Sequence, residues 1–362
     1  MDEKYMERAL ELAKKGIGRV NPNPLVGAVI VKEGEIIGEG YHECYGEAHA
    51  ERNAVKNAIK SVEGSTIYVT LEPCAHYGKT PPCVDLLIEK NFKRVVIGML
   101  DPNNLVAGKS IKKLKEHGIE VIVGVKEEEC KKINEIFIKY ITSKTPFVIL
   151  KSGMSLDGKI ATCTGKSKWI TSEESRNDSQ NLRNRVHSIM VGVNTVVADN
   201  PELTCRINDD KKLIRIIVDT NLRIPMDSKV IINKDKLTIV ATSVNSSEEK
   251  KNALRALGIK VIEVSEKKNK VDLKELMKAL GNEGIDSILI EGGGTLNFSA
   301  LEEKVVDKVI FYIAPKIIGG EESKSCIAGT GFSELDEAPN LKDISYRKIG
   351  EDLVVEGYIS NV

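Results

Sequence analysis

The stretches HAE at residues 49–51, LEPC at 71–74 and PPC at 81–83 decide how the first half of this chain is interpreted. They offer one imidazole and two thiols as candidate metal ligands, namely His49, Cys74 and Cys83. A structural zinc site fills all four positions with protein groups, whereas a catalytic site keeps one for water. Three ligands, with Glu51 spaced not to be a fourth, therefore indicate a catalytic zinc site. A structural zinc, or core residues unrelated to a metal, is the alternative.

The local patterns place these ligands at the ends of helices and strands. Helical spacing runs from 48 to 60, and a second helical pattern opens with the proline before Cys83 and runs from 82 to 90. A thiol at a helix start has a lowered pKa, which favours the thiolate that a metal needs. Cys74 lies just beyond the β-rich run 66–71. A strand end facing two helix N-termini is a common place for a site in an open α/β sheet.

The spacing resembles that of the zinc-dependent deaminases of nucleobases and nucleosides, whose signature is H-x-E followed by P-C-x-x-C. Here eight residues separate Cys74 from Cys83 instead of two, and the insert 75–82 is interpreted as a substrate-recognition loop. This longer form, with NPNPLVG at 21–27, closely resembles the deaminase half of the bifunctional riboflavin-biosynthesis deaminase/reductase family. The resemblance implies that the three candidate ligands hold zinc and that Glu51 carries protons.

Further polar residues are candidates for contacts with the ring and the phosphate of the deaminase substrate. His42 follows a β-run and His76 lies in the insert, so both are expected around the metal pocket. A histidine outside a motif is more often structural or merely exposed. The full set of candidates is Asn23, His42, His76 and Lys79.

The length of 362 residues favours two domains. Predicted elements of the first half are a helix at 2–15, strands at 25–32 and 35–41, helix 48–60, strand 65–71, helix 82–90, strand 94–99, helix 109–117, strand 119–124 and helix 126–140. This alternation predicts a mostly parallel sheet with helices on both faces. It fits the cytidine-deaminase-like three-layer α/β/α fold that the motif implies for residues 1–145. The polar stretch 141–146 is the expected boundary to a second domain at 146–362.

The second half also has an α/β pattern. Predicted strands begin near 147, 189, 213, 237, 260, 287 and 309, and predicted helices cover 247–257 and 272–281. Thr171 and Glu174 have capping-box spacing and predict a further helix start. The stretch IEGGGTL at 290–296 ends a strand, turns through three glycines and opens a helix near Leu296. Such a turn lets backbone N–H groups approach an anion, although alone it is more often only a tight turn.

Five motifs place this turn in context: SLDGK at 155–159, SKWI at 167–170, TVVAD at 195–199, VDT at 218–220 and EGGGT at 291–295. They occur in the same order in the reductase half of the same family. The resemblance therefore implies a dihydrofolate-reductase-like α/β domain that uses NADPH.

At matching positions the resemblance implies two sets of contacts. The cofactor set is Gly153, Trp169, Thr195, Asp199, Thr220, Gly293, Gly294, Thr295, Leu296, Asn297, Phe298 and Ser299. The substrate set is Ser167, Arg183, Leu203, Arg206 and Glu291, to which Lys151 is added as a nearby polar candidate. The alternatives are core packing for Trp169, an exposed helix position for Arg183 and a turn for Asp199.

Together the two halves imply zinc-dependent deamination of 2,5-diamino-6-(5-phosphoribosylamino)pyrimidin-4(3H)-one to 5-amino-6-(5-phosphoribosylamino)uracil, followed by NADPH-dependent reduction of the ribosyl group to ribityl. Lys151 and Asp199 are both candidates for proton handling in the reduction, and the sequence does not distinguish them. The 2′-phosphate of NADPH is expected near Thr220. Arg223 is either a second contact for that phosphate or a brace for Asp219.

The composition limits the partners. Basic and acidic residues number 53 each and aromatic residues make up 4%, which disfavours the basic face of a nucleic-acid-binding protein. No apolar run is long enough for a membrane span, and residues 1–4 are charged rather than secretory. Seven cysteines without a regular framework favour free thiols in a reducing cytoplasm. We expect a homo-oligomer that acts on a small molecule.

Three other classes of protein share some of these features. They are a deaminase of transfer RNA or free nucleosides with an accessory domain, a binding module stabilised by zinc, and a dihydrofolate reductase with an unrelated partner. A deaminase of RNA should carry a basic face, which the balanced charge does not favour. A binding module should hold its zinc with four protein ligands and would not need Glu51.

Overall fold

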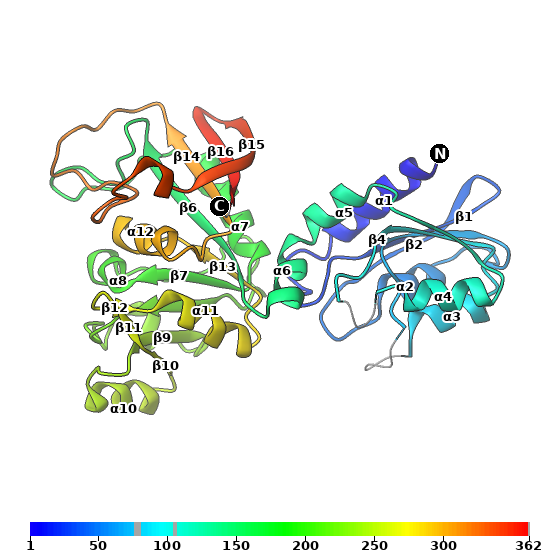
Figure 1. Cartoon of the computed structure of the whole chain (residues 1–362), viewed down its shortest axis with the longest axis horizontal. Helices are drawn as coiled ribbons and strands as arrows, with labels where there is room; N and C mark the ends of the chain where they lie inside the picture. The colour runs from blue at the N-terminus through cyan, green and yellow to red at the C-terminus, as the bar shows by residue number, and fades with distance from the viewer. Residues whose placement is uncertain (76–80, 104–106, 361–362) are drawn as a thin grey trace. The chain divides into compact units, whose positions relative to one another are not determined.

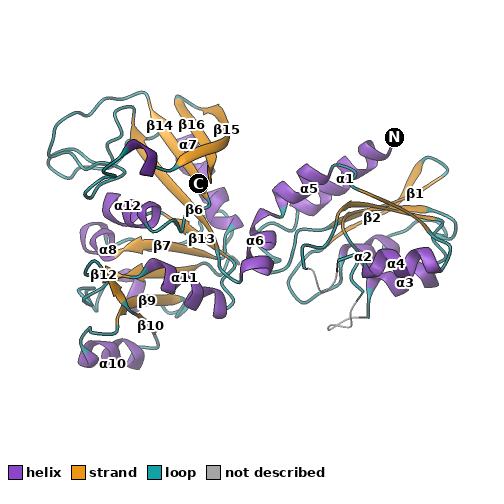
Figure 2. Cartoon of the chain, viewed as in Figure 1, coloured by secondary structure: helices purple, strands orange, loops and turns teal. Residues whose placement is uncertain are grey.

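The computed structural model describes residues 1–75, 81–103 and 107–360, so the candidates His76 and Lys79 lie outside the described residues. The chain divides into two compact units, Met1–Lys144 and Thr145–Val362. Figure 1 and Figure 2 show that each unit contains its own sheet and helices. Each unit also has hydrophobic core clusters of its own.

The sheet of the first unit has the strand order β2-β1-β3-β4-β5. Its strands are β1 (Gly27–Lys32), β2 (Glu35–Tyr41), β3 (Thr66–Leu71), β4 (Arg94–Met99) and β5 (Glu120–Val123). The expectation of a mostly parallel sheet is wrong in part, because β1 pairs antiparallel with both β2 and β3. The other pairs, β3 with β4 and β4 with β5, are parallel. The reversed direction of β1 puts its amino end at the same edge as the carboxyl ends of β2 and β3.

Helices cover both faces of this sheet and make the expected three layers (Figure 2). They are α1 (Asp2–Lys14), α2 (Ala50–Lys56), α3 (Cys83–Glu89), α4 (Lys109–Glu116), α5 (Glu127–Ile133) and α6 (Glu135–Ser143). Apolar residues of α2, α3 and α4 pack on one face of the sheet, and those of α1 and α5 pack on the other. The unit therefore has the three-layer α/β/α architecture that the motif implied.

One predicted helix of this unit, 126–140, is interrupted at Asn134. The Asn134 side chain is buried and forms two hydrogen bonds with Leu25, accepting from its N–H at 2.8 Å and donating to its C=O at 3.0 Å. This tertiary contact holds the chain segment that leads into β1. The helical pattern alone could not reveal the interruption, because the partner lies 109 residues away.

The second unit contains a nine-stranded sheet with the order β10-β9-β8-β7-β13-β6-β14-β16-β15. Its strands are β6 (Phe147–Ser155), β7 (Ser188–Gly192), β8 (Ile214–Val218), β9 (Thr238–Ser243), β10 (Lys260–Val264), β13 (Ser287–Ile290), β14 (Lys308–Ala314), β15 (Asn340–Ile349) and β16 (Asp352–Ser360). Pairing is parallel from β10 to β14 and antiparallel from β14 through β16 to β15. The carboxyl ends of the seven consecutive parallel strands therefore meet at one edge, where β15 ends as well.

The helices of the second unit are α7 (Glu173–Arg185), α8 (Val193–Asp199), α9 (Lys229–Ile232), α10 (Glu248–Ala256), α11 (Leu273–Asn282) and α12 (Gly294–Glu302), with a short 3₁₀ turn, η1 (Leu335–Glu337). The capping box expected from Thr171 and Glu174 is wrong by one residue. Ser172 is the N-cap of α7, and its hydroxyl accepts from the N–H of Ser175 at 3.2 Å. The helix after the glycine turn begins at Gly294, two residues before the expected Leu296.

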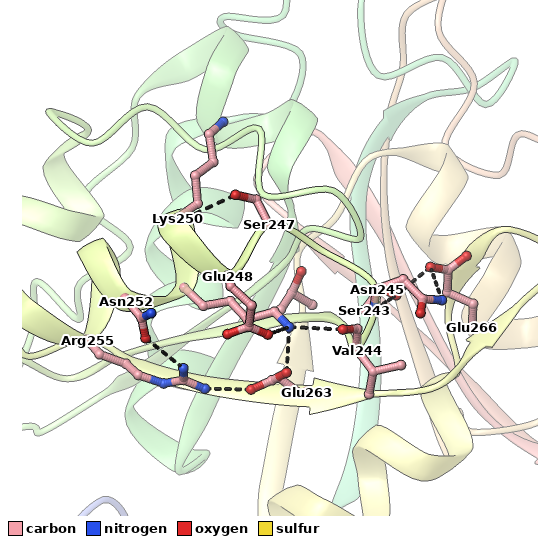
Figure 3. A network of polar contacts seen from close by, with 12 residues as sticks. Ser243, Val244, Asn245, Ser247, Glu248, Lys250, Asn252, Arg255, Glu263 and Glu266 are labelled. Atoms are coloured by element: carbon pink, nitrogen blue, oxygen red, sulfur yellow. Dashed lines mark hydrogen bonds and ion pairs between the residues drawn. The ribbon is translucent and has the colours of Figure 1, made fainter.

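A buried ammonium group fixes α10 against the edge of this sheet. The Lys251 side chain is fully buried and donates to Glu248 at 2.7 Å, to Glu263 of β10 at 2.6 Å and to the carbonyl of Val244 at 2.9 Å. Figure 3 labels these partners. Because a buried charge is costly without partners, this saturated network stabilises only one position of α10.

A glycine determines how closely α1 packs on the first sheet. A Cβ added at Gly27 would lie 1.9 Å from the Ala9 carbonyl oxygen of α1, so Gly27→Ala must displace the helix. We expect a loss of about 1–3 kcal/mol in the free energy of unfolding, measured by thermal or chemical denaturation. Gly192→Ala is the control, because its added Cβ meets Leu296 at an ordinary 3.8 Å. Equal stability of both variants would contradict this packing.

Candidate active sites

The candidate metal ligands of the first unit lie where a strand ends and two helices begin. His49 is the N-cap residue of α2, and Cys83 is the first residue of α3, with Pro82 at its N-cap. Cys74 lies just after β3. The backbone N–H of Cys83 donates to the Cys74 sulfur at 3.2 Å, which favours a thiolate there. The structure therefore brings together the three ligands that the sequence motifs suggested.

The geometry of this cluster fits zinc. His49 Nδ1 lies 3.5 Å from Cys74 Sγ and 3.4 Å from Cys83 Sγ, and all three ligand atoms lie within 4.8 Å of one another. Tetrahedral zinc with bonds of about 2.3 Å to sulfur and 2.0–2.1 Å to nitrogen requires a nitrogen–sulfur separation of roughly 3.6 Å. One ion can thus bond to all three atoms, which leaves a fourth position for water.

The two thiols are electrostatically coupled. The hydrogen bond with the Cys83 thiol lowers the pKa of Cys74 to about 4, and the same contact, together with burial, raises the pKa of Cys83. Of the two thiols, Cys83 therefore keeps its proton more readily. Because metal ligands must be deprotonated, binding of a cation releases this proton.

Glu51 lies beside the ligands as the second residue of α2 and is 3% exposed. Burial raises the pKa of Glu51, and the neighbouring Cys74 adds to the rise. A carboxyl group with a pKa nearer neutrality can both accept and donate protons during catalysis. The cluster therefore places a carboxyl group that is suited to proton transfer beside three candidate zinc ligands.

Two of the expected substrate contacts, Asn23 and His42, lie next to the metal ligands. The His42 ring packs edge-on against the His49 ring, with centroids 5.6 Å apart. His42 Nδ1 lies 3.1 Å from the carbonyl of Ala48, which can only accept, so Nδ1 carries the proton. The neutral Nε2 then accepts from the Asn23 amide at 3.1 Å. Burial lowers the pKa of His42, which keeps the ring neutral.

A buried carboxylate that the sequence analysis did not assign supports the strand end. Glu72 is 4% exposed and accepts from the N–H of Gly108 at 3.0 Å and the hydroxyl of Ser110 at 2.7 Å. It thereby joins the end of β3 to the start of α4, two residues before Cys74. The position of Glu72 inside the LEPC motif is the feature of the sequence that could have identified it.

The second unit contains a cavity of about 580 Å³ at the carboxyl edge of its parallel strands. Eight predicted cofactor contacts line it: Thr195, Asp199, Thr220, Gly293, Gly294, Thr295, Leu296 and Ser299. One predicted substrate contact, Ser167, lines it as well. A volume of this size is typical of small-molecule and cofactor sites.

The glycine turn is built for close approach of a ligand. A Cβ added at Gly294 would lie 2.4 Å from the Ser325 carbonyl oxygen, so this position is packed against the protein. A Cβ added at Gly293 would have no heavy atom within 4 Å, because that side faces open space. Gly293 is also the N-cap of α12, where free backbone N–H groups favour an anion. The turn therefore fits the phosphate groups of a dinucleotide.

Four other predicted cofactor residues lie outside the set that lines this cavity. Asn297 and Phe298 are buried in α12, and the Asn297 amide donates to the Cys326 carbonyl at 2.8 Å. Trp169 is 61% exposed beneath the Arg176 guanidinium, 4.4 Å from the ring centroid. Gly153 lies within β6, facing Thr171. Their contact with a cofactor stays a prediction.

The predicted substrate residues centre on a partly buried ion pair. Arg183 and Glu291 form a two-point contact at 3.0 and 2.8 Å, and Lys151 Nζ lies 3.9 Å from the Glu291 carboxylate. Burial alone would raise the pKa of Glu291, but Lys151 and Arg183 lower it to about 2. The exposed-helix alternative for Arg183 is therefore wrong.

Two further predicted substrate residues, Leu203 and Arg206, belong to the loop that follows α8. The Arg183 guanidinium donates to the Thr204 carbonyl of this loop at 2.7 Å. Leu203 is buried with a left-handed φ of 53°, and the Arg206 N–H donates to the Gln180 side chain at 3.0 Å. The ion pair and this loop are thus one connected region.

Comparison with known proteins places both halves in one family. The family described as the RibD C-terminal domain matches residues 146–355, and the cytidine and deoxycytidylate deaminase zinc-binding region matches residues 1–99. The riboflavin biosynthesis protein RibD of Actinobacillus pleuropneumoniae is 48% identical over 98% of this chain and 94% of its own length. The chain belongs to the RibD family.

Other RibD proteins agree with this assignment. The Escherichia coli protein is 40% identical over 97% of this chain and 98% of its own length. The solved structure of Acinetobacter baumannii RibD covers 99% of both chains with a TM-score of 0.89 and 36% identity. That of a deaminase/reductase from Thermotoga maritima covers 99% of both chains with a TM-score of 0.87 and 40% identity.

This RibD-family chain is therefore a bifunctional enzyme of riboflavin biosynthesis, with a zinc-binding deaminase domain and a reductase domain. Its cofactors are zinc and NADPH. Within the described residues, no helix has the length and apolar character required to cross a membrane.

Removing one thiol should separate the two sites. Cys83→Ser should lose zinc, measured as metal content after gel filtration, because only two of the three ligands remain. NADPH binding should persist, because the cofactor cavity belongs to the other unit. Cys130→Ser removes a buried thiol of α5 from the same unit and is the control. Stoichiometric zinc in Cys83→Ser would contradict the ligand assignment.

Gly293 and Gly294 should respond differently to an added methyl group. Gly293→Ala has room and an ordinary φ of −76°, so it should fold normally and narrow the cavity. If the backbone N–H groups there hold a phosphate, NADPH should bind roughly ten- to a hundred-fold more weakly. Gly294→Ala should instead lower stability through its collision with Ser325. The affinity for NADPH is measured by calorimetry. An unchanged affinity in Gly293→Ala would contradict the assignment of phosphate binding to this turn.

Proposed function

We propose that the first unit hydrolyses the amino group at carbon 2 of 2,5-diamino-6-(5-phosphoribosylamino)pyrimidin-4(3H)-one. The second unit then reduces the ribosyl group of the resulting 5-amino-6-(5-phosphoribosylamino)uracil to ribityl. The observation that carries the proposal is the three-ligand cluster with the buried Glu51 beside it. The Thermotoga maritima relative is named as the deaminase and reductase of these two compounds, which supports the same substrates here.

In the deaminase site, His49, Cys74 and Cys83 would hold the zinc ion, which supplies an activated water. Glu51 would accept one proton as the water attacks the amidine carbon, and would pass this proton to the ring nitrogen. It would then take the second proton from the hydroxyl group formed at that carbon and pass it to the departing ammonia, for which its raised pKa suits it. Asn23 and His42 orient the ring. The predicted contacts His76 and Lys79 are proposed for the substrate on the strength of their place in the insert.

In the reductase site, NADPH supplies the hydride to C1 of the opened ribosyl group, and the protein orients both partners. Thr195, Asp199, Thr220 and the glycine turn hold the cofactor, since they line one cavity. The Arg183–Glu291 pair fixes the substrate side together with Lys151. Two residues are candidate proton donors for the reduction. Asp199 lines the cofactor cavity, and Lys151 lies beside Glu291 on the substrate side.

We also propose a homo-oligomer located in the cytoplasm, with functional domains at 1–145 and 146–362. An edge strand with exposed apolar side chains supports self-association: β15 carries Ile344 at 59% and Tyr346 at 80% exposure. Seven free cysteines support a reducing compartment. The division between compact units at 144/145 and the family match from residue 146 support the two functional domains.

Glu51→Gln tests the deaminase proposal. Because Glu51 carries protons and does not bind the metal, the variant should keep zinc and lose about 10²–10⁴-fold in the rate of ammonia release. NADPH oxidation with the deaminated uracil ribotide should be unchanged. Glu47→Gln, an exposed carboxylate near the start of α2, is the control. Loss of zinc together with activity would show that Glu51 is a ligand instead.

A further inference from the structure

A basic hairpin lies beside the cofactor cavity of the second unit. β11 (Glu266–Lys267) and β12 (Lys270–Val271) pair antiparallel as a sheet of their own. Lys268 and Asn269 form the turn with left-handed φ angles of 51° and 59°. These angles are those of a type I′ turn, whose twist matches the flanking strands. Three of the six residues, Lys267, Lys268 and Lys270, are cationic.

So short a hairpin is marginal alone, and side-chain contacts hold it in place. Glu266 accepts from the hydroxyl of Ser243, the last residue of β9, and from the amide of Asn245 just beyond it (Figure 3). The Val271 N–H donates to Thr220 Oγ1 at 3.3 Å, just beyond β8. The hairpin is therefore positioned by the ends of two sheet strands.

The lysines of this hairpin differ in their surroundings. Lys268 forms an ion pair with Glu302 at 2.7 Å and is not among the cavity-lining residues. Lys270 lines the cavity, and its ammonium donates to the neutral hydroxyl of Ser299 at 3.2 Å. Arg223 lines the same cavity and donates to the neutral amide of Asn194 at 2.9 Å. Lys270 and Arg223 thus keep a positive charge that no short ion pair among the described residues neutralises.

Lys270 contacts α12 at a point away from the glycine turn that begins this helix. Its partner Ser299 is the sixth residue of α12, counted from Gly294. Five rises of 1.5 Å place it about 7.5 Å along the helix from Gly294, near which the diphosphate of a dinucleotide fits. Thr220, which contacts the hairpin through Val271, lies with Lys270 at this second position. The cavity therefore offers two separate places for phosphate groups.

NADPH differs from NADH only by a phosphate on the 2′ oxygen of the adenosine ribose. We propose that Lys270, together with Arg223, binds this 2′-phosphate and sets the preference of the enzyme for NADPH. The inference rests on the proposed reductase site and adds to it the β11–β12 hairpin. Arg223 can contact the phosphate at two points, and the Lys270 ammonium adds a second charge. Arg223 then has the phosphate-binding role and not that of a brace for Asp219, which accepts from the Ile224 N–H instead.

Lys270→Gln is the direct test, since the side chain is exposed and the variant should fold. KM for NADPH should rise roughly ten- to a hundred-fold, while KM for NADH should change less than about two-fold. Lys268→Gln is the matched control on the same hairpin and should keep the wild-type preference. Lys270→Arg keeps the charge and should restore most of the NADPH preference.

Calorimetry with adenosine 2′,5′-bisphosphate and with AMP gives a readout independent of turnover. Wild type should bind the bisphosphate more tightly, and Lys270→Gln should remove that difference. An equal loss of NADPH and NADH affinity would place Lys270 at the diphosphate and overturn the inference, as would an unchanged preference. Failure of the wild-type protein to bind NADPH at all would instead contradict the reductase site itself.

Discussion

Both sites depend on the shared direction of neighbouring strands, because strands that run the same way end at one edge of the sheet. In the first unit, β2 and β3 run the same way and deliver His42 and Cys74 to that edge. Asn23 precedes β1, and it reaches this edge because β1 runs in the opposite direction. The antiparallel pairing that departs from the expected sheet is therefore what completes the deaminase site. Helices α2 and α3 then begin there and add the remaining zinc ligands.

The second unit applies the same constraint over more strands. Gly192 ends β7, Thr220 comes after β8 and Gly293 comes after β13, and all three line one cavity. Burial and neighbouring charges then determine the pKa of the carboxyl group at each site. The same desolvation that raises the pKa of Glu51 is outweighed at Glu291 by Lys151 and Arg183. One carboxyl group is thereby suited to carry protons, whereas the other is held ionised as a fixed anchor.

Local signals in the sequence were sufficient for much of this structure. Helix starts and strand ends located His49, Cys74 and Cys83, and β10 and β13 begin at the predicted residues 260 and 287. Local sequence patterns did not predict the conformation where a residue distant in the sequence determines it. Asn134 ends a helix because of Leu25, and the hairpin at Lys270 forms because of Thr220 and Ser243. The strand β15 was missed because most of its residues are exposed and polar, so no apolar alternation marks it.

Time courses of ammonia release and NADPH oxidation in a single reaction test the division of labour most directly. The zinc-loaded protein would receive the diaminopyrimidine ribotide and NADPH together. Two sites acting in the order proposed predict that ammonia appears without delay, that NADPH oxidation follows after a lag, and that the totals reach one to one. NADPH oxidation without prior ammonia release, or ammonia release with no NADPH oxidised, would contradict a deaminase followed by a reductase in this chain.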